Sequence, residues 1–225
     1  MIRASALGAI LLLVSVGCRT APAPAPAPPA DVATEYDLVY AISHNRVSFA
    51  PSPFLVSSTR GLAPGTAVDI GSGNGRNSLY LARRGFHVTA VDLSRVGLDL
   101  TRQAAEAEHL PVTTLAEDIN QFDFGRNRWD LIVLIDFPFS YRALLPRIAA
   151  GLKPGGEVVI QAVSSHQPGS LDSPDHSLRY TFMRHADLRG PFAGFSVLHD
   201  SEAEEPTVWG VKAIMIRVAA QKPTS

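Results

Sequence analysis

The sequence predicts an α/β domain built around a parallel sheet, and three observations support this. Short runs rich in Val, Ile and Leu alternate with segments of helical periodicity, which is typical of strands joined by crossover helices. A turn with glycines at alternate positions, Gly71, Gly73 and Gly75, separates the first strand from the helix that follows it. The 225 residues have nearly balanced charges, and the part beyond the N-terminal segment suits one domain with a sizeable core.

The first thirty residues do not have the composition of a folded domain. Residues 1–20 are interpreted as a lipoprotein-like signal peptide, because Arg3 precedes an apolar run and small residues stand directly before Cys18. The apolar run is too short for a comfortable membrane span. Residues 21–30 are an Ala/Pro linker, expected to be a polyproline II spacer of roughly 30 Å at about 3.1 Å per residue. The folded domain should then occupy residues 31–225.

Two alternatives for this segment remain open, namely an ordinary signal peptide and an upstream extension from a misassigned start. The order of a charged start, an apolar run, a cysteine site and a proline spacer favours an exported, membrane-anchored lipoprotein. The alternative location is the cytoplasm.

Five short apolar segments are predicted to be parallel strands. They are Thr66–Ile70, His87–Val91, Val112–Ala116, Asp130–Ile135 and Glu157–Ala162. The run Asp130–Ile135 is almost continuously apolar, so it should be the central strand, buried on both faces. Lys153–Gly156 should be a turn that positions the fifth strand. Beyond it, Phe195–His199 and Val208–Val218 are expected to pair antiparallel through an acidic turn, Glu202–Glu205.

Four segments are predicted to be helices. They are Tyr36–Ser48, Asn77–Arg84, a segment from Ser94 to about Glu108, and Tyr141–Ala150. Ser94 is a preferred N-cap residue, and Gly85 is typical of the position after a helix. Gln167–Ser177 is rich in Pro, Ser, Asp and Gly, which predicts a loop over the strand ends.

The glycine turn and the acidic strand ends predict a site for a nucleoside-containing cofactor. Alternate glycines let the backbone approach a ligand with no Cβ in the way, at the edge where α/β sheets bind ligands. Asp92 ends the second strand, where a carboxylate can accept hydrogen bonds from ribose hydroxyls. Asp118 follows the third strand, where a carboxylate can accept from an adenine amino group. The alternatives are a purely structural turn, a helix-capping role for Asp92 and a plain loop acid at Asp118.

The spacing and charge of the turn favour S-adenosylmethionine over NAD. The turn has the form G-x-G-x-G, whereas dinucleotide sites use G-x-G-x-x-G. Asp69 stands just before it. A carboxylate there would repel a pyrophosphate, but it would suit the ammonium and sulfonium charges of S-adenosylmethionine.

At this point the sequence resembles a known family. Val68–Ser94, Asp118, Trp129–Phe137 and Gly151–Gly156 resemble a class I S-adenosylmethionine-dependent methyltransferase. Gly73–Ala82 is similar to the tellurite-resistance and thiopurine methyltransferase branch. The resemblance implies a Rossmann-like three-layer sandwich with a seven-stranded, mostly parallel sheet of order 3-2-1-4-5-7-6, in which strand 7 is antiparallel.

The resemblance also implies roles for individual residues. Asp69 and the glycine loop would hold the methionine moiety, Asp92 the ribose and Asp118 with Ile119 the adenine, while Ile135 would border the transferable methyl. The residues expected to contact the cofactor are Asp69, Gly71, Ser72, Gly73, Asn74, Gly75, Asn77, Asp92, Leu93, Asp118, Ile119 and Ile135.

The methyl acceptor is expected to be a small molecule bearing a thiol, a metalloid oxyanion or a hydroxyl. A hydroxyl would benefit from a general base. Asp136 is the best-placed candidate, with a helix-capping role as its alternative. Tyr141 and His166 are further candidates, although the sequence favours an ordinary loop or surface role for His166 and for His185.

Composition narrows the partners. A net charge of −1 gives no reason to expect nucleic acid. Cys18 is the single cysteine and the histidines are scattered, so no metal site is expected. A membrane would be contacted only through a lipid at Cys18. The alternative function is a catalytically silent, lipid-anchored protein that binds S-adenosylmethionine or a related nucleoside.

Overall fold

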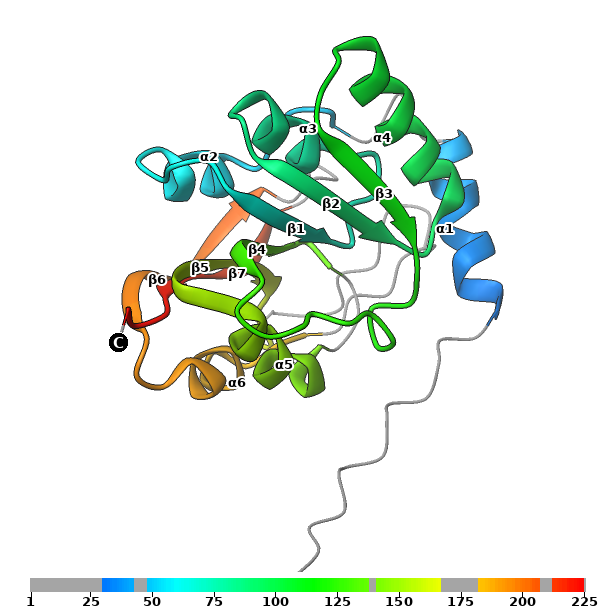
Figure 1. Cartoon of the computed structure of the whole chain (residues 1–225). Helices are drawn as coiled ribbons and strands as arrows, with labels where there is room; N and C mark the ends of the chain where they lie inside the picture. The colour runs from blue at the N-terminus through cyan, green and yellow to red at the C-terminus, as the bar shows by residue number, and fades with distance from the viewer. Residues whose placement is uncertain (1–29, 43–47, 138–140, 167–181, 207–211, 225) are drawn as a thin grey trace, which may run out of the picture.

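The computed structural model describes residues 30–42, 48–137, 141–166, 182–206 and 212–224. The predicted signal peptide, nearly all of the Ala/Pro linker and the predicted loop at 167–177 lie outside these residues. A seven-stranded sheet of order β3-β2-β1-β4-β5-β7-β6 runs through the described part (Figure 1). This confirms the predicted Rossmann-like fold and strand order.

Five parallel strands form most of the sheet, as expected. They are β1 (Thr66–Ile70), β2 (His87–Asp92), β3 (Val112–Ala116), β4 (Trp129–Ile135) and β5 (Leu152–Val163). β7 (Lys212–Gln221) pairs antiparallel with β5 on one side and with β6 (Ser196–Pro206) on the other. Every residue of β4 is buried except Asp130, which agrees with its central position.

Helices cover the two faces of the sheet. One face carries α2 (Pro53–Thr59), α3 (Arg76–Arg83) and α4 (Arg95–Ala107), and the other carries α5 (Leu145–Gly151) and α6 (His185–Arg189), while α1 (Ala30–Ile42) packs against α4 (Figure 1). Ser94 caps α4 as predicted, since its side chain accepts a hydrogen bond from the N–H of Gly97. The sequence analysis missed α2, in which Ser52 is the N-cap and Pro53 takes the first turn.

The interpretation of Lys153–Gly156 as a turn is wrong, because these residues lie inside β5. They bulge out of the β4–β5 pairing, which passes from Trp129–Leu152 directly to Leu131–Glu157. Backbone bonds with the far end of β7 hold the bulge, since Gly155 N–H donates to the carbonyl of Lys222. The predicted turn is therefore a bulge within β5, a strand that stays paired.

The expected acidic turn at Glu202–Glu205 is also wrong, because these residues belong to β6. Cations on β7 compensate two of these charges, and a hydroxyl just beyond β5 binds a third carboxylate. Glu204 pairs with Lys212, Glu205 pairs with Arg217, and Glu202 accepts a hydrogen bond from Ser164. The acidic run by itself predicted a turn, because the sequence around it gives no information about these distant partners.

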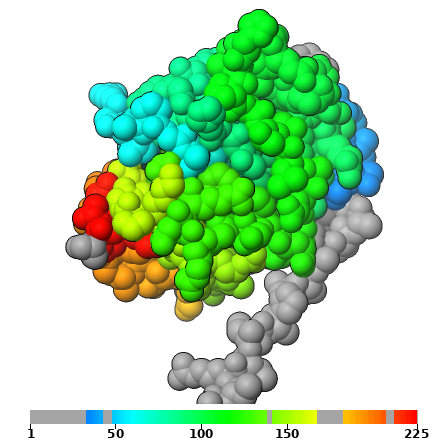
Figure 2. All heavy atoms as spheres, in the orientation of Figure 1, coloured from blue at the N-terminus to red at the C-terminus, as the bar shows by residue number. Residues whose placement is uncertain are grey.

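Helix α1 is fastened to the start of α4. Asp37 Oδ1 accepts hydrogen bonds from Ser94 Oγ at 2.6 Å and from the N–H of Val96 at 3.1 Å. The arrowheads of β1, β2 and β3 point toward the end of the molecule where α1 lies (Figure 1). In the space-filling view α1 forms the edge of a face made mostly of residues near 100–130 (Figure 2).

We predict that Asp37→Ala lowers the free energy of unfolding by about 0.5–2 kcal/mol, the usual effect of losing a cap. The measurement is urea denaturation at pH 7. The matched control is Asp99→Ala on α4, whose ion pair with Arg102 is largely exposed; its effect should stay below about 0.5 kcal/mol. Equal effects of the two substitutions would contradict the capping role of Asp37.

Candidate cofactor and acceptor site

The glycine loop lies at the carboxyl end of β1, and each of its glycines is sterically required. Gly71, Gly73 and Gly75 have φ angles of +69°, +54° and +79°. A Cβ on Gly71 would stand 2.4 Å from the ring of Phe137, and one on Gly73 would stand 2.1 Å from Tyr40 Oη. The loop is therefore packed from above by α1 and by the residues that follow β4.

Asp92 at the end of β2 holds this loop in place. Its Oδ2 accepts a hydrogen bond from Gly73 N–H and its Oδ1 accepts one from Ser94 N–H, both at 2.8 Å. Burial raises the pKa of the Asp92 carboxyl, while these backbone hydrogen bonds oppose the rise. A carboxylate oxygen has two lone pairs, so each oxygen can still accept from a ribose hydroxyl.

Asp69 lies beneath the loop with 1% of its surface exposed. Its Oδ2 accepts a 2.6 Å hydrogen bond from Ser78 Oγ on α3. Burial raises the pKa of Asp69 to about 6, against the opposing effects of the Ser78 hydrogen bond and the Arg76 charge. The sequence analysis did not identify Ser78, which no pattern links to Asp69.

Three buried polar atoms around the loop have no hydrogen-bond partner among the described residues: Ser72 Oγ, Asn74 Nδ2 and Asp118 Oδ2. Asp118 Oδ1, by contrast, accepts from the main chain and side chain of Asn120 at 2.9 and 3.0 Å. A buried polar atom without a partner costs about 1–3 kcal/mol. These residues therefore fit a polar ligand such as S-adenosylmethionine, with Asp118 Oδ2 able to accept from the adenine amino group.

The other residues predicted to contact the cofactor differ in their burial and in their hydrogen-bond partners. Leu93 is half-buried directly after Asp92. Ile119 and Ile135 are buried, with 5% and 4% of their surfaces exposed. Asn77 Oδ1 accepts a hydrogen bond from Ser52 N–H at the start of α2. The structure thus brings Asp69, the loop, Asp92 and Asp118 to one sheet edge, while the Asn77 amide oxygen is directed to α2.

Asp136 follows β4 and has both carboxylate oxygens engaged. Oδ2 forms a 2.7 Å ion pair with Arg76, and Oδ1 accepts a 2.8 Å hydrogen bond from Gln161. Its φ of +58° lies in the left-handed region, which is uncommon for a residue with a side chain. Each oxygen of Asp136 therefore already accepts one hydrogen bond and keeps one further lone pair. Arg76 was not predicted, although it stands directly after the glycine loop.

Tyr141 has a buried hydroxyl with no hydrogen-bond partner among the described residues. Burial and the charge of Asp136 raise the pKa of this phenol, so Tyr141 stays protonated at neutral pH. It can act as a hydrogen-bond donor, but it is unsuited to be a base.

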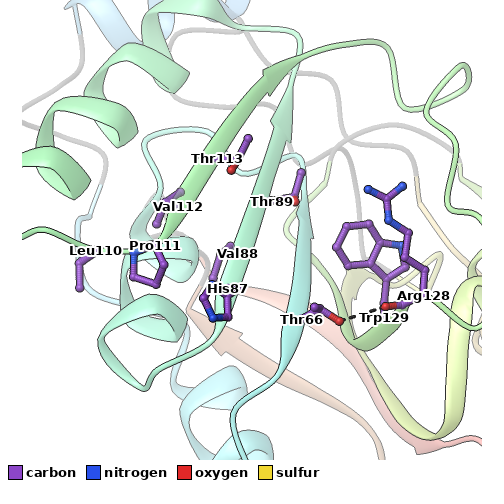
Figure 3. A pocket seen from close by; sticks show the side chains of 10 residues that line it. All are labelled: Thr66, His87, Val88, Thr89, Leu110, Pro111, Val112, Thr113, Arg128 and Trp129. Atoms are coloured by element: carbon purple, nitrogen blue, oxygen red, sulfur yellow. Dashed lines mark hydrogen bonds between the residues drawn. The ribbon is translucent and has the colours of Figure 1, made fainter.

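An open cavity lies at the opposite, amino end of β1, β2 and β3 (Figure 3). Thr66, His87 and Thr113 line it, and Arg128 stacks on Trp129 at its edge. It exists because residues 117–128 connect β3 to β4 without a helix. Its position separates it from the glycine loop.

Two further features bear on the kind of site. In the described ranges no group of three or more His, Cys, Asp or Glu side chains could hold a metal ion. Of the helices that the structure describes, none combines the length and the apolar character needed to cross a bilayer.

A seven-stranded sheet with this order, a glycine loop after β1 and acids after β2 and β3 is the arrangement that the resemblance to S-adenosylmethionine-dependent methyltransferases predicted. Residues 67–156 match a family model described as a methyltransferase domain. This part of the chain, less than half of its length, is therefore similar to a methyltransferase domain.

The chain is also similar to individual proteins that are described as methyltransferases. A probable S-adenosyl-L-methionine-dependent methyltransferase TehB of Haemophilus influenzae is 28% identical over 116 residues, 49% of this chain and 41% of the relative. The crystal structure of TehB from the same species has a TM-score of 0.67 at 22% identity and covers 83% of this chain and 67% of that one. The chain spans less than half the length of the curated relatives it matches.

A third similar protein is the 1,6-didemethyltoxoflavin-N1-methyltransferase of Burkholderia thailandensis, solved with 1,6-didemethyltoxoflavin and S-adenosylhomocysteine. Its TM-score is 0.60 at 24% identity, over 89% of this chain and 94% of that one. At this identity the likeness shows a shared fold.

We predict that the buried charge of Asp69 destabilises the protein above pH 6. The pKa of Asp69 rises from 3.8 to about 6 on folding. Between these values the unfolded chain has released the proton and the folded chain retains it, so stability falls as pH rises from about 4 to 6 and then levels off. A difference of two pKa units corresponds to about 3 kcal/mol.

The test is urea denaturation of Asp69→Asn and of the unsubstituted protein from pH 4 to 8. The difference between the two isolates Asp69 from the other carboxyls. The variant should gain relative stability up to pH 6 and none beyond. A difference independent of pH would contradict the assigned pKa.

Proposed function

We propose that this protein transfers a methyl group from S-adenosylmethionine to a small molecule bound over the carboxyl ends of β4 and β5. The observation that carries the proposal is the partnerless Asp118 Oδ2, buried at the same sheet edge as Asp92 and the glycine loop. When bound, S-adenosylmethionine supplies an activated methyl on its sulfonium. The loop and Asp92 would orient this donor.

The acceptor side supports a small polar molecule. Asp136, Gln161 and Arg217 form a hydrogen-bonded chain behind β4 and β5, in which Arg217 Nε donates to Gln161 Oε1 at 3.1 Å. Arg76 and Glu205 extend this chain at its two ends through ion pairs. Because the charges of these side chains are paired, we expect the chain to form a rigid side of the acceptor site. We therefore assign Asp136 a positioning role.

We predict that the purified chain binds S-adenosylhomocysteine with micromolar affinity and binds NAD far more weakly, as measured by calorimetry. The physical reason is that Asp69, beneath the glycine loop, would repel a pyrophosphate. Binding of NAD that equals or exceeds that of S-adenosylhomocysteine would refute the proposal.

The substitution Asp118→Asn sharpens this test. The amide oxygen would keep accepting from Asn120, so the NH₂ group would face the adenine amino group. Affinity for S-adenosylhomocysteine should fall by about 1.5–3 kcal/mol, the value for a hydrogen bond to a charged group. Asp123→Asn is the matched control, since Asp123 is exposed in the same loop.

We also propose that the protein is exported and anchored to a membrane through a lipid on Cys18, by the pattern of residues 1–29. Expression in a bacterial host should place the full chain in the membrane fraction, with a lipid-modified Cys18 as its first residue by mass spectrometry. Cys18→Ala should remove both results. An unmodified Met1 on protein in the soluble fraction would contradict this location.

A further inference from the structure

Ser164, His166 and Glu202 form a polar cluster just beyond the end of β5. The Glu202 carboxylate, on β6, accepts a hydrogen bond from Ser164 Oγ, and its Oε1 lies 2.8 Å from His166 Nδ1. The main-chain N–H of His166 donates to Ser164 Oγ at 3.0 Å. Two hydrogen bonds therefore fix where the His166 ring stands.

The cluster determines which ring nitrogen of His166 carries the hydrogen. The hydrogen bond from Ser164 lowers the pKa of Glu202, so this carboxylate is ionised at neutral pH and can only accept. Nδ1 must then be the donor, and Nε2 keeps its lone pair. No described residue bonds to Nε2, and the His166 side chain is 70% exposed.

His166 lies on the acceptor side of the site. β5 runs parallel to β4, and Gln161 of β5 stands level with Ile135 at the end of β4. β5 ends at Val163, Ser164 forms an isolated bridge with Met183, and His166 lies in the turn that follows. His166 is therefore placed beyond the strand ends, at the edge where the glycine loop lies.

The other candidate bases are less suited than His166. Asp136 already accepts a hydrogen bond at each oxygen, one of them in an ion pair with Arg76, and the phenol of Tyr141 stays protonated. His185 Nε2 is held by Asp200, which also pairs with Arg189. His185 also acts on Glu202 through its charge.

We propose that His166 is the general base for a hydroxyl-bearing small-molecule acceptor and that Glu202 is its positioning residue. This proposal rests on the proposed methyltransferase function. The hydroxyl proton passes to Nε2 while the oxygen bonds to the methyl carbon, and the electron pair of the broken C–S bond returns to sulfur. The imidazolium that forms is stabilised by Glu202. A thiolate or an oxyanion would need no such base, which is why a hydroxyl is favoured.

The first test determines the tautomer of His166 without requiring activity. Nitrogen-15 spectra of the full chain labelled at histidine, assigned with His166→Gln, should show the Nδ1–H form when the ring is neutral. Glu202→Ala should shift the ring toward the Nε2–H form, and Glu204→Ala, an exposed acid on the same strand, should not. A predominant Nε2–H form in the unsubstituted protein would overturn the proposal.

The second test measures S-adenosylhomocysteine formation with catechol, dithiothreitol and tellurite as probes. His166→Gln should lower catechol methylation at least about 100-fold, the lower end for general-base catalysis, and leave the Kd for S-adenosylhomocysteine unchanged. Any turnover of the thiol or the oxyanion should be retained. Unchanged catechol turnover in His166→Gln would overturn the proposal that His166 is the general base.

The two proposals fail in distinguishable ways. A chain that binds S-adenosylhomocysteine but does not methylate catechol contradicts the hydroxyl base and leaves the cofactor site standing. A chain that fails to bind S-adenosylhomocysteine contradicts the proposed function itself.

Discussion

The bridge that Asp92 makes between Gly73 and Ser94 is the interaction on which the site depends. One carboxylate joins the loop after β1 to the start of α4, using one oxygen for each backbone N–H. Thr101 adds a hydrogen bond to the Gly73 carbonyl from the other side. α1 is in turn fixed to Ser94 by Asp37. Hydrogen bonds thus join the loop, α4 and α1 into one unit.

This unit brings the carboxylates of Asp69 and Asp92 together at a site with little exposure to solvent. Asp69 is buried and Asp92 is half-buried, and the charge of Asp92 contributes to the raised pKa of Asp69. A folded protein bears such a cost where the charges serve a ligand. A cofactor with an ammonium and a sulfonium group offsets the repulsion, whereas a pyrophosphate increases it. The electrostatic preference inferred from the sequence therefore acts through desolvated carboxylates rather than exposed ones.

The sequence predicted the elements whose signals are local and missed those that depend on distant partners. The five parallel strands, the Ser94 cap and the glycine loop follow from runs, caps and turns of a few residues. The bulge at Lys153–Gly156 depends on pairing with the end of β7, and the acidic strand depends on cations elsewhere. Arg76 and Asp136 meet across 60 positions of sequence, so no spacing rule links them.

The acceptor side of the site depends most strongly on partners that are distant in sequence. The cofactor half of the site is encoded by contiguous motifs, because a loop and two strand ends suffice to build it. The candidate base instead depends on Glu202, which lies 36 residues from His166 and reaches it from β6. In the sequence His166 is an ordinary loop histidine, and only the antiparallel β6–β7 pair places a carboxylate beside it. Acceptor chemistry in this fold can therefore change through the last strands while the cofactor loop stays the same.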